Sequence, residues 1–305
     1  MTTDLHTRVA SLRFDFDACE TEPVEACNLC GSTTHAEVAR SDRYGFRSNL
    51  LICCECGLGF LSPRLSEAEY ARFYATTYRP LVSAYHDRTI DAQTVQEEQE
   101  VYAAELATFL GARLGARPPK SIIDVGGSTG VVGRAIGESF GSDLTVLDPA
   151  EDELVVAAEA GAETILGFAE NYDAGGRTWD LVLLCQTIDH LLDISRTLDA
   201  IRAMLAPDGH AFIDVLDVQF MIQRRGSAEG ASKIDHPFYL TRETAIAYFS
   251  GAGLSVVGER LADDGHWGFV LAPATAAAVD RDQLKAHADQ LLRSAWLRRA
   301  TPSIA

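Results

Sequence analysis

Two Cys-x-x-Cys pairs constrain the N-terminal part of this 305-residue chain more than any other feature. Cys27 and Cys30 form the first pair, Cys53 and Cys56 form the second, and 22 residues lie between the pairs. The tight turn of such a pair directs two thiolates toward one ion, and the glycine after each pair tolerates the backbone angles of the turn. Four thiolates complete a tetrahedral shell that suits zinc and leaves no position open for substrate. We therefore predict a structural zinc site.

The seven cysteines also allow other interpretations. Buried thiols or a redox pair are the alternative to a metal site, and Cys54 is an alternative ligand to Cys53. The N-terminus carries charges throughout and lacks the apolar core of a signal peptide, and no run of about 18 apolar residues occurs. We therefore expect a cytoplasmic protein with reduced thiols and no membrane partner. The sequence leaves the oligomeric state open.

A change of pattern at Arg117-Pro118-Pro119 marks the main boundary of the chain. Before it, Ser66 and Glu69 have the spacing of a helix-capping box, and a charged helical pattern runs from Asp91 to Gly111. After it, short apolar runs alternate with helical patterns. We expect a lead-in that is mostly irregular at 1–26, a zinc-binding module at 27–62, a helical lid or linker at 63–117, a main domain at 118–273 and a C-terminal helix at 274–305.

The main domain has the pattern of an α/β fold. Strands are expected at 121–125, 144–147, 163–166, 181–185 and 211–216. Continuously apolar strands that are separated by helices indicate a parallel sheet covered on both faces. Two further runs, at 254–261 and 267–272, flank the turn-like Asp263-Asp264-Gly265 and predict an antiparallel hairpin at the sheet edge.

A glycine-containing segment follows the first of these strands. Gly126, Gly127 and Gly130 lie between the strand that carries Asp124 and the next helix. Glycines permit close backbone approach, and a helix N-terminus offers free N–H groups to an anion. No register fits G-x-G-x-x-G, which argues against a dinucleotide. Asp148 ends the second strand, where a carboxylate can accept both hydroxyls of a ribose.

Together these residues resemble the class I S-adenosylmethionine-dependent methyltransferases. The likeness extends to Trp179-Asp180 at the fourth strand, Asp189-His190 after it and Pro207-Asp208-Gly209 before the fifth. It implies a Rossmann-like sheet of seven strands. It also implies that the glycines line the methionine part of S-adenosylmethionine, Asp148 binds its ribose, Ala169 and Glu170 lie near its adenine, and Gln186 lies beside its methionine end. The residues expected at the cofactor are Asp124, Gly126, Gly127, Gly130, Asp148, Pro149, Ala169, Glu170, Gln186 and Tyr78.

The order of the modules resembles a narrower family, the zinc-containing sugar C-methyltransferases of deoxysugar biosynthesis. In that family a Cys-rich module and a Tyr-rich helical segment, here Tyr70, Tyr74 and Tyr78, precede the methyltransferase domain. A Tyr-x-Glu-His motif follows the fifth strand and supplies acid–base groups. The matching residues here are Lys233-Ile234-Asp235-His236, so the histidine is retained while Lys and Asp replace Tyr and Glu.

Four residues are candidates for the chemistry of methyl transfer. His190 and His236 are candidate bases, because an imidazole with a pKa of about 6.5 exchanges protons readily at neutral pH. Asp235 can orient the ring of its neighbour His236, and Tyr239 can line the site. His190 as a structural residue at a helix start and Tyr239 as a core aromatic are the alternative interpretations.

Charge narrows the class of acceptor. The chain has 26 Lys and Arg against 44 Asp and Glu, a net charge of −18. Such a field repels polyanions, so nucleic acid is a poor partner. We therefore expect a methyltransferase with a small-molecule acceptor, a sugar or another natural-product intermediate, methylated on carbon or oxygen. A non-catalytic scaffold whose zinc module docks a partner, and an RNA methyltransferase, are the alternatives.

Overall fold

A seven-stranded mixed sheet forms the larger half of the protein. The computed structural model describes residues 4–90 and 92–299. The strand order is β12-β13-β10-β9-β6-β7-β8, and the pairs from β10 to β8 are parallel while β13 pairs antiparallel with β10 and β12. The predicted α/β fold, the parallel strands and the hairpin at the edge are thereby confirmed. The strands are β6 (Ser121–Val125), β7 (Asp143–Asp148), β8 (Glu163–Leu166), β9 (Trp179–Leu184), β10 (Leu205–Leu216), β12 (Leu254–Leu261) and β13 (His266–Pro273).

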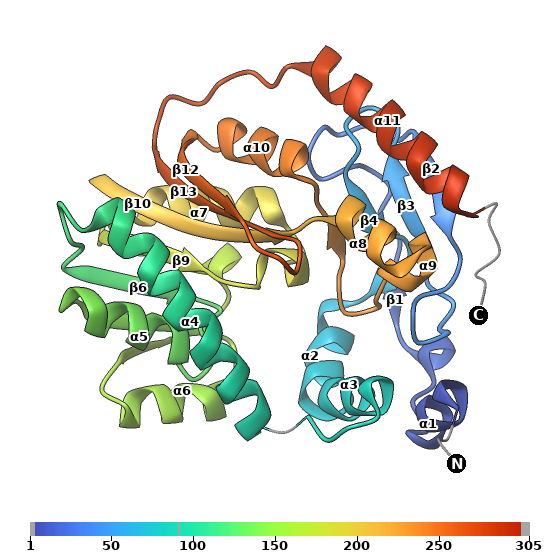
Figure 1. Ribbon diagram of the computed structural model, residues 1–305, viewed down its shortest axis with the longest axis horizontal. Coiled ribbons are helices and arrows are strands. Elements are labelled where there is room, and N and C mark those ends of the chain that lie inside the picture. Colours follow the sequence, from blue (N-terminus) through green and yellow to red (C-terminus); the bar gives the residue numbers. More distant parts are fainter. Residues whose placement is uncertain (1–3, 91, 300–305) are drawn as a thin grey trace.

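Helices cover both faces of this sheet (Figure 1). Alternate residues of one strand serve opposite faces, as strand geometry requires. Ile122 packs with helices α4 (Ala92–Leu114) and α5 (Val131–Phe140), whereas Ile123 belongs to the cluster that contains α7 (Ile194–Met204) and α10 (Arg242–Gly251). Helix α6 (Glu151–Glu159) connects β7 to β8. The continuously apolar strands of the sequence are thus explained by burial on both sides.

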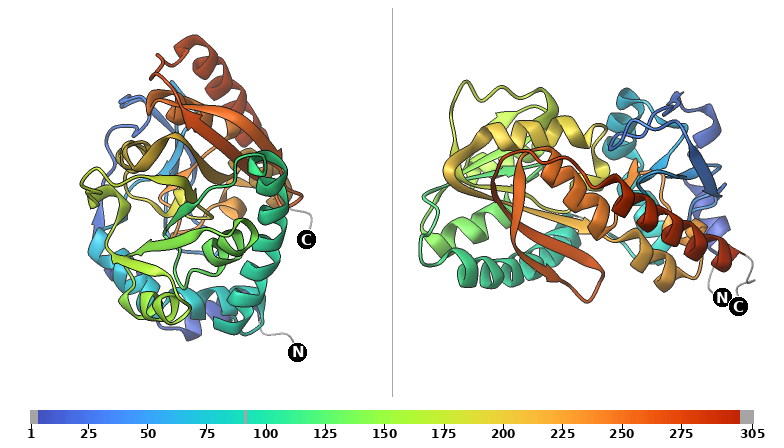
Figure 2. Two further views of the ribbon diagram at one scale, coloured as in Figure 1. Left: turned by 90° about the vertical axis from the view of Figure 1, so that its left-hand side faces the viewer. Right: turned by 90° about the horizontal axis from the view of Figure 1, so that it is seen from above.

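A second sheet organises the cysteine-containing module. Its order is β11-β4-β3-β2, with β2 (His35–Ala39), β3 (Leu50–Cys53), β4 (Gly59–Leu61) and β11 (Phe238–Tyr239). Strand β11 comes from far along the chain, after β10, α8 (Val218–Arg225) and α9 (Ala228–Ala231). After β10 the chain leaves the large sheet and contributes β11, which pairs with β4, to the sheet of the N-terminal module. It then continues into α10, which packs on the large sheet. Figure 2 shows the N-terminal module beside the large sheet.

The first 26 residues are more ordered than expected. They contain α1 (Leu5–Ser11), the 3-10 helix η1 (Phe16–Ala18) and β1 (Thr21–Glu22), which pairs with β5 (Arg64–Leu65). About half of the described part of this lead-in is regular, and Val9 and Phe16 are buried in a cluster with residues of the next helices. The apolar patterns in this polar segment are too short to predict its helices from sequence.

Helices α2 (Glu67–Thr76) and α3 (Tyr78–His86) follow, and Ser66 caps α2 by accepting the N–H of Glu69 at 3.4 Å. Both helices pack in the cluster that contains Ile234. The C-terminal helix α11 (Arg281–Arg299) contacts β2, β3 and α10. Residues 1–3 and 300–305, and Asp91 at the expected start of the long helix, lie outside the described residues. No helix within the described ranges is long and apolar enough to span a membrane.

Candidate functional site

The glycine loop lies at the carboxyl end of β6 and turns into α5. Gly126 and Gly130 have φ of +69° and +73°, a region that favours glycine. A Cβ at Gly126 would also come within 2.7 Å of Cγ2 of Thr187, so glycine is required there for space as well. Ser128, where the methyltransferase family usually has glycine, adopts φ +53°, which explains that preference.

The side chain of Asp124 packs against this loop and hydrogen-bonds to the helix that follows it. The side chain is buried, and Oδ2 accepts the N–H of Gly133 at 2.9 Å. Burial raises the pKa of Asp124 to about 7. Oδ1 is buried and has no hydrogen-bond partner among the described residues. A Cβ at Gly127 would lie 2.7 Å from the Asp124 carboxyl carbon, so loop and carboxylate are in close contact. The structure thus places Asp124 beneath the loop, as a support for the residues that face a ligand.

Asp148 stands at the end of β7, beside the same loop. Its Oδ2 accepts the N–H of Ser128 at 2.9 Å, and Oδ1 accepts the N–H of Ala150 at 2.8 Å. Burial raises the pKa of the Asp148 carboxyl group above its usual value. Each carboxylate oxygen keeps a second lone pair, so the side chain can still accept two ribose hydroxyls. This donor and acceptor set fits the cofactor that the sequence resemblance implies.

The other predicted cofactor residues lie along the same edge of the sheet. Pro149 follows β7, Ala169 and Glu170 open the 3-10 helix η2 (Ala169–Asn171) after β8, and Gln186 follows β9. Gln186 adopts φ +51°, and its N–H donates to Oδ1 of Asp214 at 2.6 Å. Ligands of open α/β sheets bind at the carboxyl ends of the strands, where these residues are gathered. Tyr78 begins α3 and belongs to an aromatic group with Phe73 and Tyr74. The next residue, Arg79, forms an ion pair with Glu153 of α6, with Nη2 3.5 Å from Oε1.

The substitution Asp148→Asn is expected to weaken binding of S-adenosylhomocysteine, the demethylated cofactor, by about 10- to 100-fold. The variant replaces one acceptor by a donor and removes the charge, and a hydrogen bond to a charged group contributes about 1.5–3 kcal/mol. Calorimetric titration measures the change in Kd. Glu151→Gln, which removes the same charge from the exposed start of α6, is the matched control. Equal affinities for Asp148→Asn and the control would contradict the assignment of Asp148.

A histidine and a carboxylate meet at the junction between the two halves of the molecule. Asp189 lies in the 3-10 helix η3 (Ile188–His190) after β9, and His236 precedes β11. His236 Nδ1 is 2.8 Å from Asp189 Oδ2. Burial lowers the pKa of His236 to about 4, although Asp189 opposes this shift. Burial thus favours the neutral imidazole at pH 7. With Nδ1–H donated to Asp189, the lone pair on Nε2 lies 3.6 Å from Oδ2 of Asp235.

His190, the second predicted base, lies against His236. The ring centroids are 4.5 Å apart and the rings are edge to face. His190 Nδ1 lies 2.6 Å from the hydroxyl of Tyr74 and 3.0 Å from the carbonyl oxygen of Asp235. The Tyr74 hydroxyl also donates to that carbonyl, at 3.0 Å. These bonds fix the His190 ring between α2 and the segment before β11.

The remaining predicted residues support this histidine pair. Asp235 is fully buried, with Oδ2 3.1 Å from Lys233 Nζ and 3.6 Å from His236 Nε2. Burial acts to raise the pKa of Asp235, but Lys233, His236 and His190 together outweigh it and the pKa is lowered to about 2. The hydroxyl of Tyr239 accepts the N–H of Lys233 and donates to its carbonyl, both at 2.7 Å. Tyr239 therefore holds the turn at Lys233. A small cavity beside His236 is lined by Asp189, Tyr239 and Arg43 among other residues.

Two residues of this site were absent from the candidates chosen from sequence. Asp189 was noted only as part of the family likeness, although an acidic residue directly after a buried strand is the signal that could have identified it. Lys233 carries no local signal, since its ion pair with Asp235 depends on burial of the turn.

The buried neutral His236 predicts a pH dependence of stability. An unfolded histidine has a pKa of about 6.5, so between pH 6.5 and pH 4 the unfolded state binds a proton that the folded state does not. The contribution of His236 to the free energy of unfolding is therefore lost as the pH falls, by about 2 kcal/mol at pH 5. Urea unfolding at pH 7 and pH 5 measures this loss. His236→Asn is expected to lose less stability than the wild type, and an equal loss would contradict the assignment.

The four cysteines converge as predicted. Sγ of Cys27 lies 3.5 Å from that of Cys56, Sγ of Cys30 lies 3.5 Å from that of Cys53, and all four lie within 4.8 Å of one another. A zinc ion with Zn–S bonds of about 2.3 Å needs sulfur atoms about 3.8 Å apart, so the cluster fits tetrahedral zinc. Gly31 and Gly57 have the positive φ expected of the turns, at +74° and +82°. Cys54 lies outside the group, which makes Cys53 the ligand.

Comparison with known proteins agrees with this geometry. Residues 95–259 match the model of a family described as a methyltransferase domain. The C-methyltransferase NovU of Streptomyces niveus is 25% identical over 281 residues, which cover 88% of this chain and 65% of NovU. The chain thus spans about two thirds of the length of this curated relative.

Two solved structures share the fold. An S-adenosylmethionine-dependent methyltransferase of Leishmania major has a TM-score of 0.51 at 16% identity, covering 67% of this chain and 82% of that chain. The N,N-8-amino-8-demethyl-D-riboflavin dimethyltransferase RosA of Streptomyces davawensis has a TM-score of 0.50 at 14% identity, covering 67% and 62%. The matched domain exceeds half of the chain and contains the glycine loop, Asp148 and Asp189. The chain therefore belongs to the S-adenosylmethionine-dependent methyltransferases.

Proposed function

We propose that the chain transfers a methyl group from S-adenosylmethionine to a carbon atom of a small anionic acceptor, with His236 as the base. The observation that carries the proposal is the pairing of the buried His236 with Asp189, with Nδ1 2.8 Å from Oδ2. S-Adenosylmethionine supplies a methyl group that is already electrophilic. The protein must therefore position the acceptor, exclude water and remove a proton.

The pair is suited to removing a proton from carbon next to a ketone. Nε2 of His236 would take the proton, and the C–H electron pair would pass to the ketone oxygen as an enolate. The enolate carbon would then bond to the methyl group as the S–CH₃ bond breaks and S-adenosylhomocysteine leaves. Asp189 holds the ring in the tautomer that leaves Nε2 free and stabilises the imidazolium once it forms. Lys233 Nζ, 3.1 Å from Oδ2 of Asp235 and on a side chain that is 15% exposed, offsets the charge of that buried carboxylate. The description of NovU as a C-methyltransferase supports carbon as the methylated atom.

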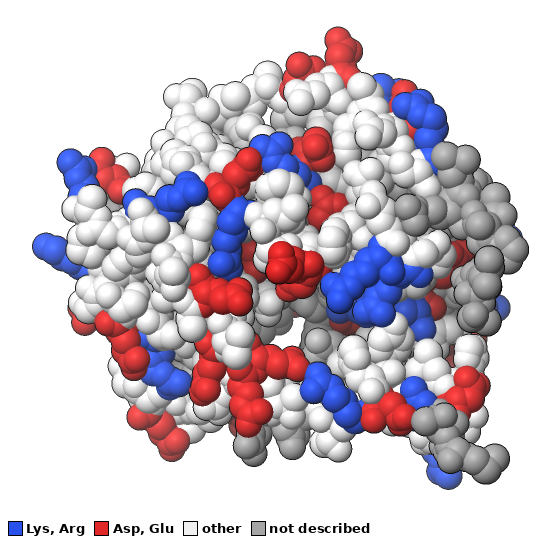
Figure 3. All heavy atoms as spheres, viewed as in Figure 1, with Lys and Arg blue, Asp and Glu red and all other residues white. Residues whose placement is uncertain are grey.

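Basic side chains beside the cavity support an anionic acceptor. On the face drawn in Figure 3, Lys and Arg gather over the end of α8 despite the net charge of −18. The guanidinium carbons of Arg43 and Arg225 lie 5.4 Å and 5.9 Å from the ring centre of Tyr85. Nε of Arg43 is buried and has no hydrogen-bond partner among the described residues, and Arg43 lines the same cavity as His236. With the resemblance to sugar C-methyltransferases, this arrangement favours a keto sugar that carries a diphosphate.

The test is an assay of nucleoside diphosphate keto-deoxysugars with S-adenosylmethionine, followed by mass spectrometry and NMR of the product. We expect a new C–CH₃ group next to the ketone. In D₂O without the methyl donor, the wild type is expected to exchange the proton on that carbon, and His236→Asn is not. Arg43→Met is expected to raise KM for the sugar about 10-fold, and the exposed Arg224→Met serves as control. A methyl group on oxygen or nitrogen would overturn carbon as the target.

A further inference from the structure

The turn that carries Asp189 is held in place from the cysteine module. Asn28, between Cys27 and Cys30, donates from Nδ2 to Oδ1 of Asp193 at 3.0 Å. Its backbone carbonyl accepts the hydroxyl of Ser195 at 3.2 Å, and its Oδ1 accepts the N–H of Ser195 at 3.3 Å. Asp193 is the N-cap of α7 and accepts the N–H of Arg196 at 3.1 Å. Asn28 thus binds the start of α7, whose N-cap Asp193 lies three residues after His190.

A second residue of the N-terminal part holds the same loop. Arg64 of β5 donates from Nη1 to the carbonyl of Leu192 at 2.9 Å. The guanidinium is itself fixed by Glu22, with Nη2 2.7 Å from Oε1, and its side chain is only 13% exposed. The carbonyl of Leu192 and the side chain of Asp193 are therefore both bonded by residues that precede the methyltransferase domain.

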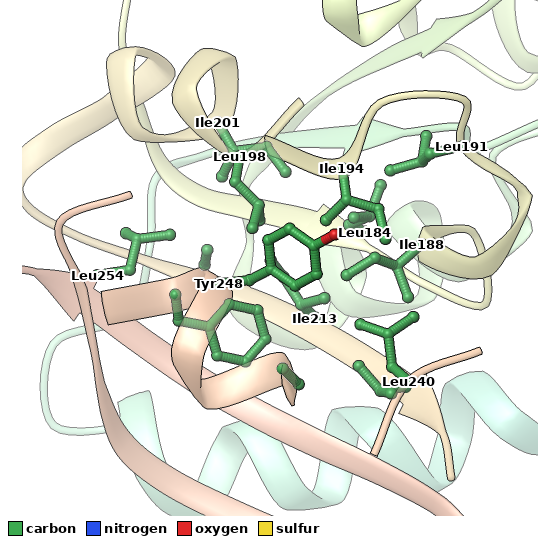
Figure 4. Packing of buried hydrophobic residues seen from close by; sticks show 14 of the residues in the cluster. Leu184, Ile188, Leu191, Ile194, Leu198, Ile201, Ile213, Leu240, Tyr248 and Leu254 are labelled. Carbon is green, nitrogen blue, oxygen red and sulfur yellow. The ribbon is translucent and has the colours of Figure 1, made fainter. Parts of the chain in front are cut away.

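Tyr248 of α10 also links Asn28 to the turn that carries Asp189. Its hydroxyl donates to Oδ1 of Asn28 at 2.9 Å, and its ring lies among Ile188, Leu191 and Ile194 (Figure 4). The apolar contacts reach Ile188, the residue directly before Asp189. Asn28 is therefore linked to the Asp189 turn by a packed side chain as well as through α7.

Asn28 lies inside the turn of the first Cys pair, between two of the four clustered thiols. The turn of the first pair is closed by the N–H of Gly31, which donates to the carbonyl of Cys27 at 2.8 Å. The second pair is placed differently, because a Cβ at Gly57 would lie 2.9 Å from the His287 ring of α11. The first Cys pair thus lies against α7, the helix that follows the proposed active site. The second pair lies against α11.

We propose that Asn28 is a positioning residue, through which the metal-bound cysteine module sets the position of Asp189 against His236. The inference rests on the proposed function for the role of that pair. It predicts that a change at Asn28 disturbs the Asp189 turn while the cofactor loop, which lies at β6 and β7, is unaffected. The cysteine cluster then acts on the acceptor half of the reaction and leaves cofactor binding intact.

A reciprocal exchange of side chains tests this coupling. Asn28→Asp places two carboxylates 3.0 Å apart and removes the donor to Asp193. The double variant Asn28→Asp with Asp193→Asn removes the pair of carboxylates and offers an amide NH₂ to the new carboxylate. The amide oxygen can still accept the Arg196 N–H as an N-cap. Glu55→Gln, in the exposed turn of the second pair, is the matched control. Asn28→Ala, which removes the contacts without adding charge, replaces Asn28→Asp if that variant does not fold.

The measurements need no methyl acceptor. A negative result for Asn28 can therefore be distinguished from a wrong assignment of the proposed function. They are hydrogen exchange of residues 188–196, the imidazole NMR signals of His190 and His236, zinc content and S-adenosylhomocysteine affinity. We expect Asn28→Asp to speed exchange in 188–196 by about 10-fold or more and to shift both histidine signals, with zinc bound and cofactor affinity within about 2-fold of wild type. The double variant is expected to restore both signals and the protection.

Two results would overturn the proposal. One is unchanged exchange and unchanged histidine signals in Asn28→Asp with zinc bound. The other is equal loss of protection in α5 and in residues 188–196, together with weaker cofactor binding and no recovery in the double variant. The first would show that the contact carries no coupling, and the second that Asn28 only stabilises the fold as a whole.

Discussion

Replacing His236 by Asn is expected to slow methyl transfer by about 10²- to 10⁴-fold, the range that a positioned general base contributes. Asn is smaller and can still donate to Asp189, but it has no basic lone pair with which to take a proton. The rate under saturating S-adenosylmethionine, with the keto sugar that proves to be the acceptor, measures the effect. Calorimetric affinity for S-adenosylhomocysteine is expected to stay within about 2-fold, because His236 lies outside the glycine loop.

Two further variants distinguish the role of His236 as base from the roles of Asp189 and Tyr239. Asp189→Asn is expected to lower the rate as well, because it removes the charge that fixes the His236 tautomer 2.8 Å away. Tyr239→Phe removes only hydrogen bonds to the Lys233 backbone, so it is expected to lower stability more than proton transfer. A His236→Asn protein with wild-type rate, or a Tyr239→Phe protein with the larger loss of rate, would contradict the assignment of His236.

Replacing Cys53 by Ser is expected to abolish stoichiometric zinc binding and to lower Tm by about 10 °C or more. Structural zinc sites contribute folding free energy directly, and a hydroxyl does not replace a thiolate at such a site. A loss of several kcal/mol lowers Tm by about 2–4 °C per kcal/mol in a protein of 150–250 residues. Metal analysis of the purified protein and calorimetric melting measure both effects.

Cys54→Ser is the matched control, since Cys54 adjoins Cys53 but lies outside the sulfur cluster. It is expected to keep one zinc ion per chain and to melt close to the wild type. Zinc retention in Cys53→Ser together with zinc loss in Cys54→Ser would reverse the ligand assignment. Wild-type protein that purifies without zinc and melts unchanged when zinc is added would contradict a structural metal site altogether.

The fold of the main domain was predictable because its signals are local. Segments such as Leu181–Leu184 of β9 are continuously apolar, so the parallel sheet follows from composition over a few residues. The glycine loop and Asp148 were predictable for the same reason, because each directly follows such a strand. The two Cys pairs needed only their spacing to indicate a common site.

The contacts between the two halves had no local signal. Strand β11 is two residues long and pairs with β4, which lies nearly 180 residues earlier in the chain. Asn28 binds Asp193 across 165 residues, and an asparagine within a Cys pair does not indicate a distant partner. His236 was identified by its motif, but its burial, which lowers its pKa, depends on the excursion of the chain after β10.

The measurement that tests the central claim most directly is a calorimetric titration of S-adenosylhomocysteine into zinc-loaded, cofactor-free wild-type protein. The geometry of the glycine loop and Asp148 predicts saturable micromolar binding at one site per chain. Absence of binding to a folded sample would contradict the assignment of this edge of the sheet as a cofactor site. It would also remove the source of the methyl group on which the proposed function depends.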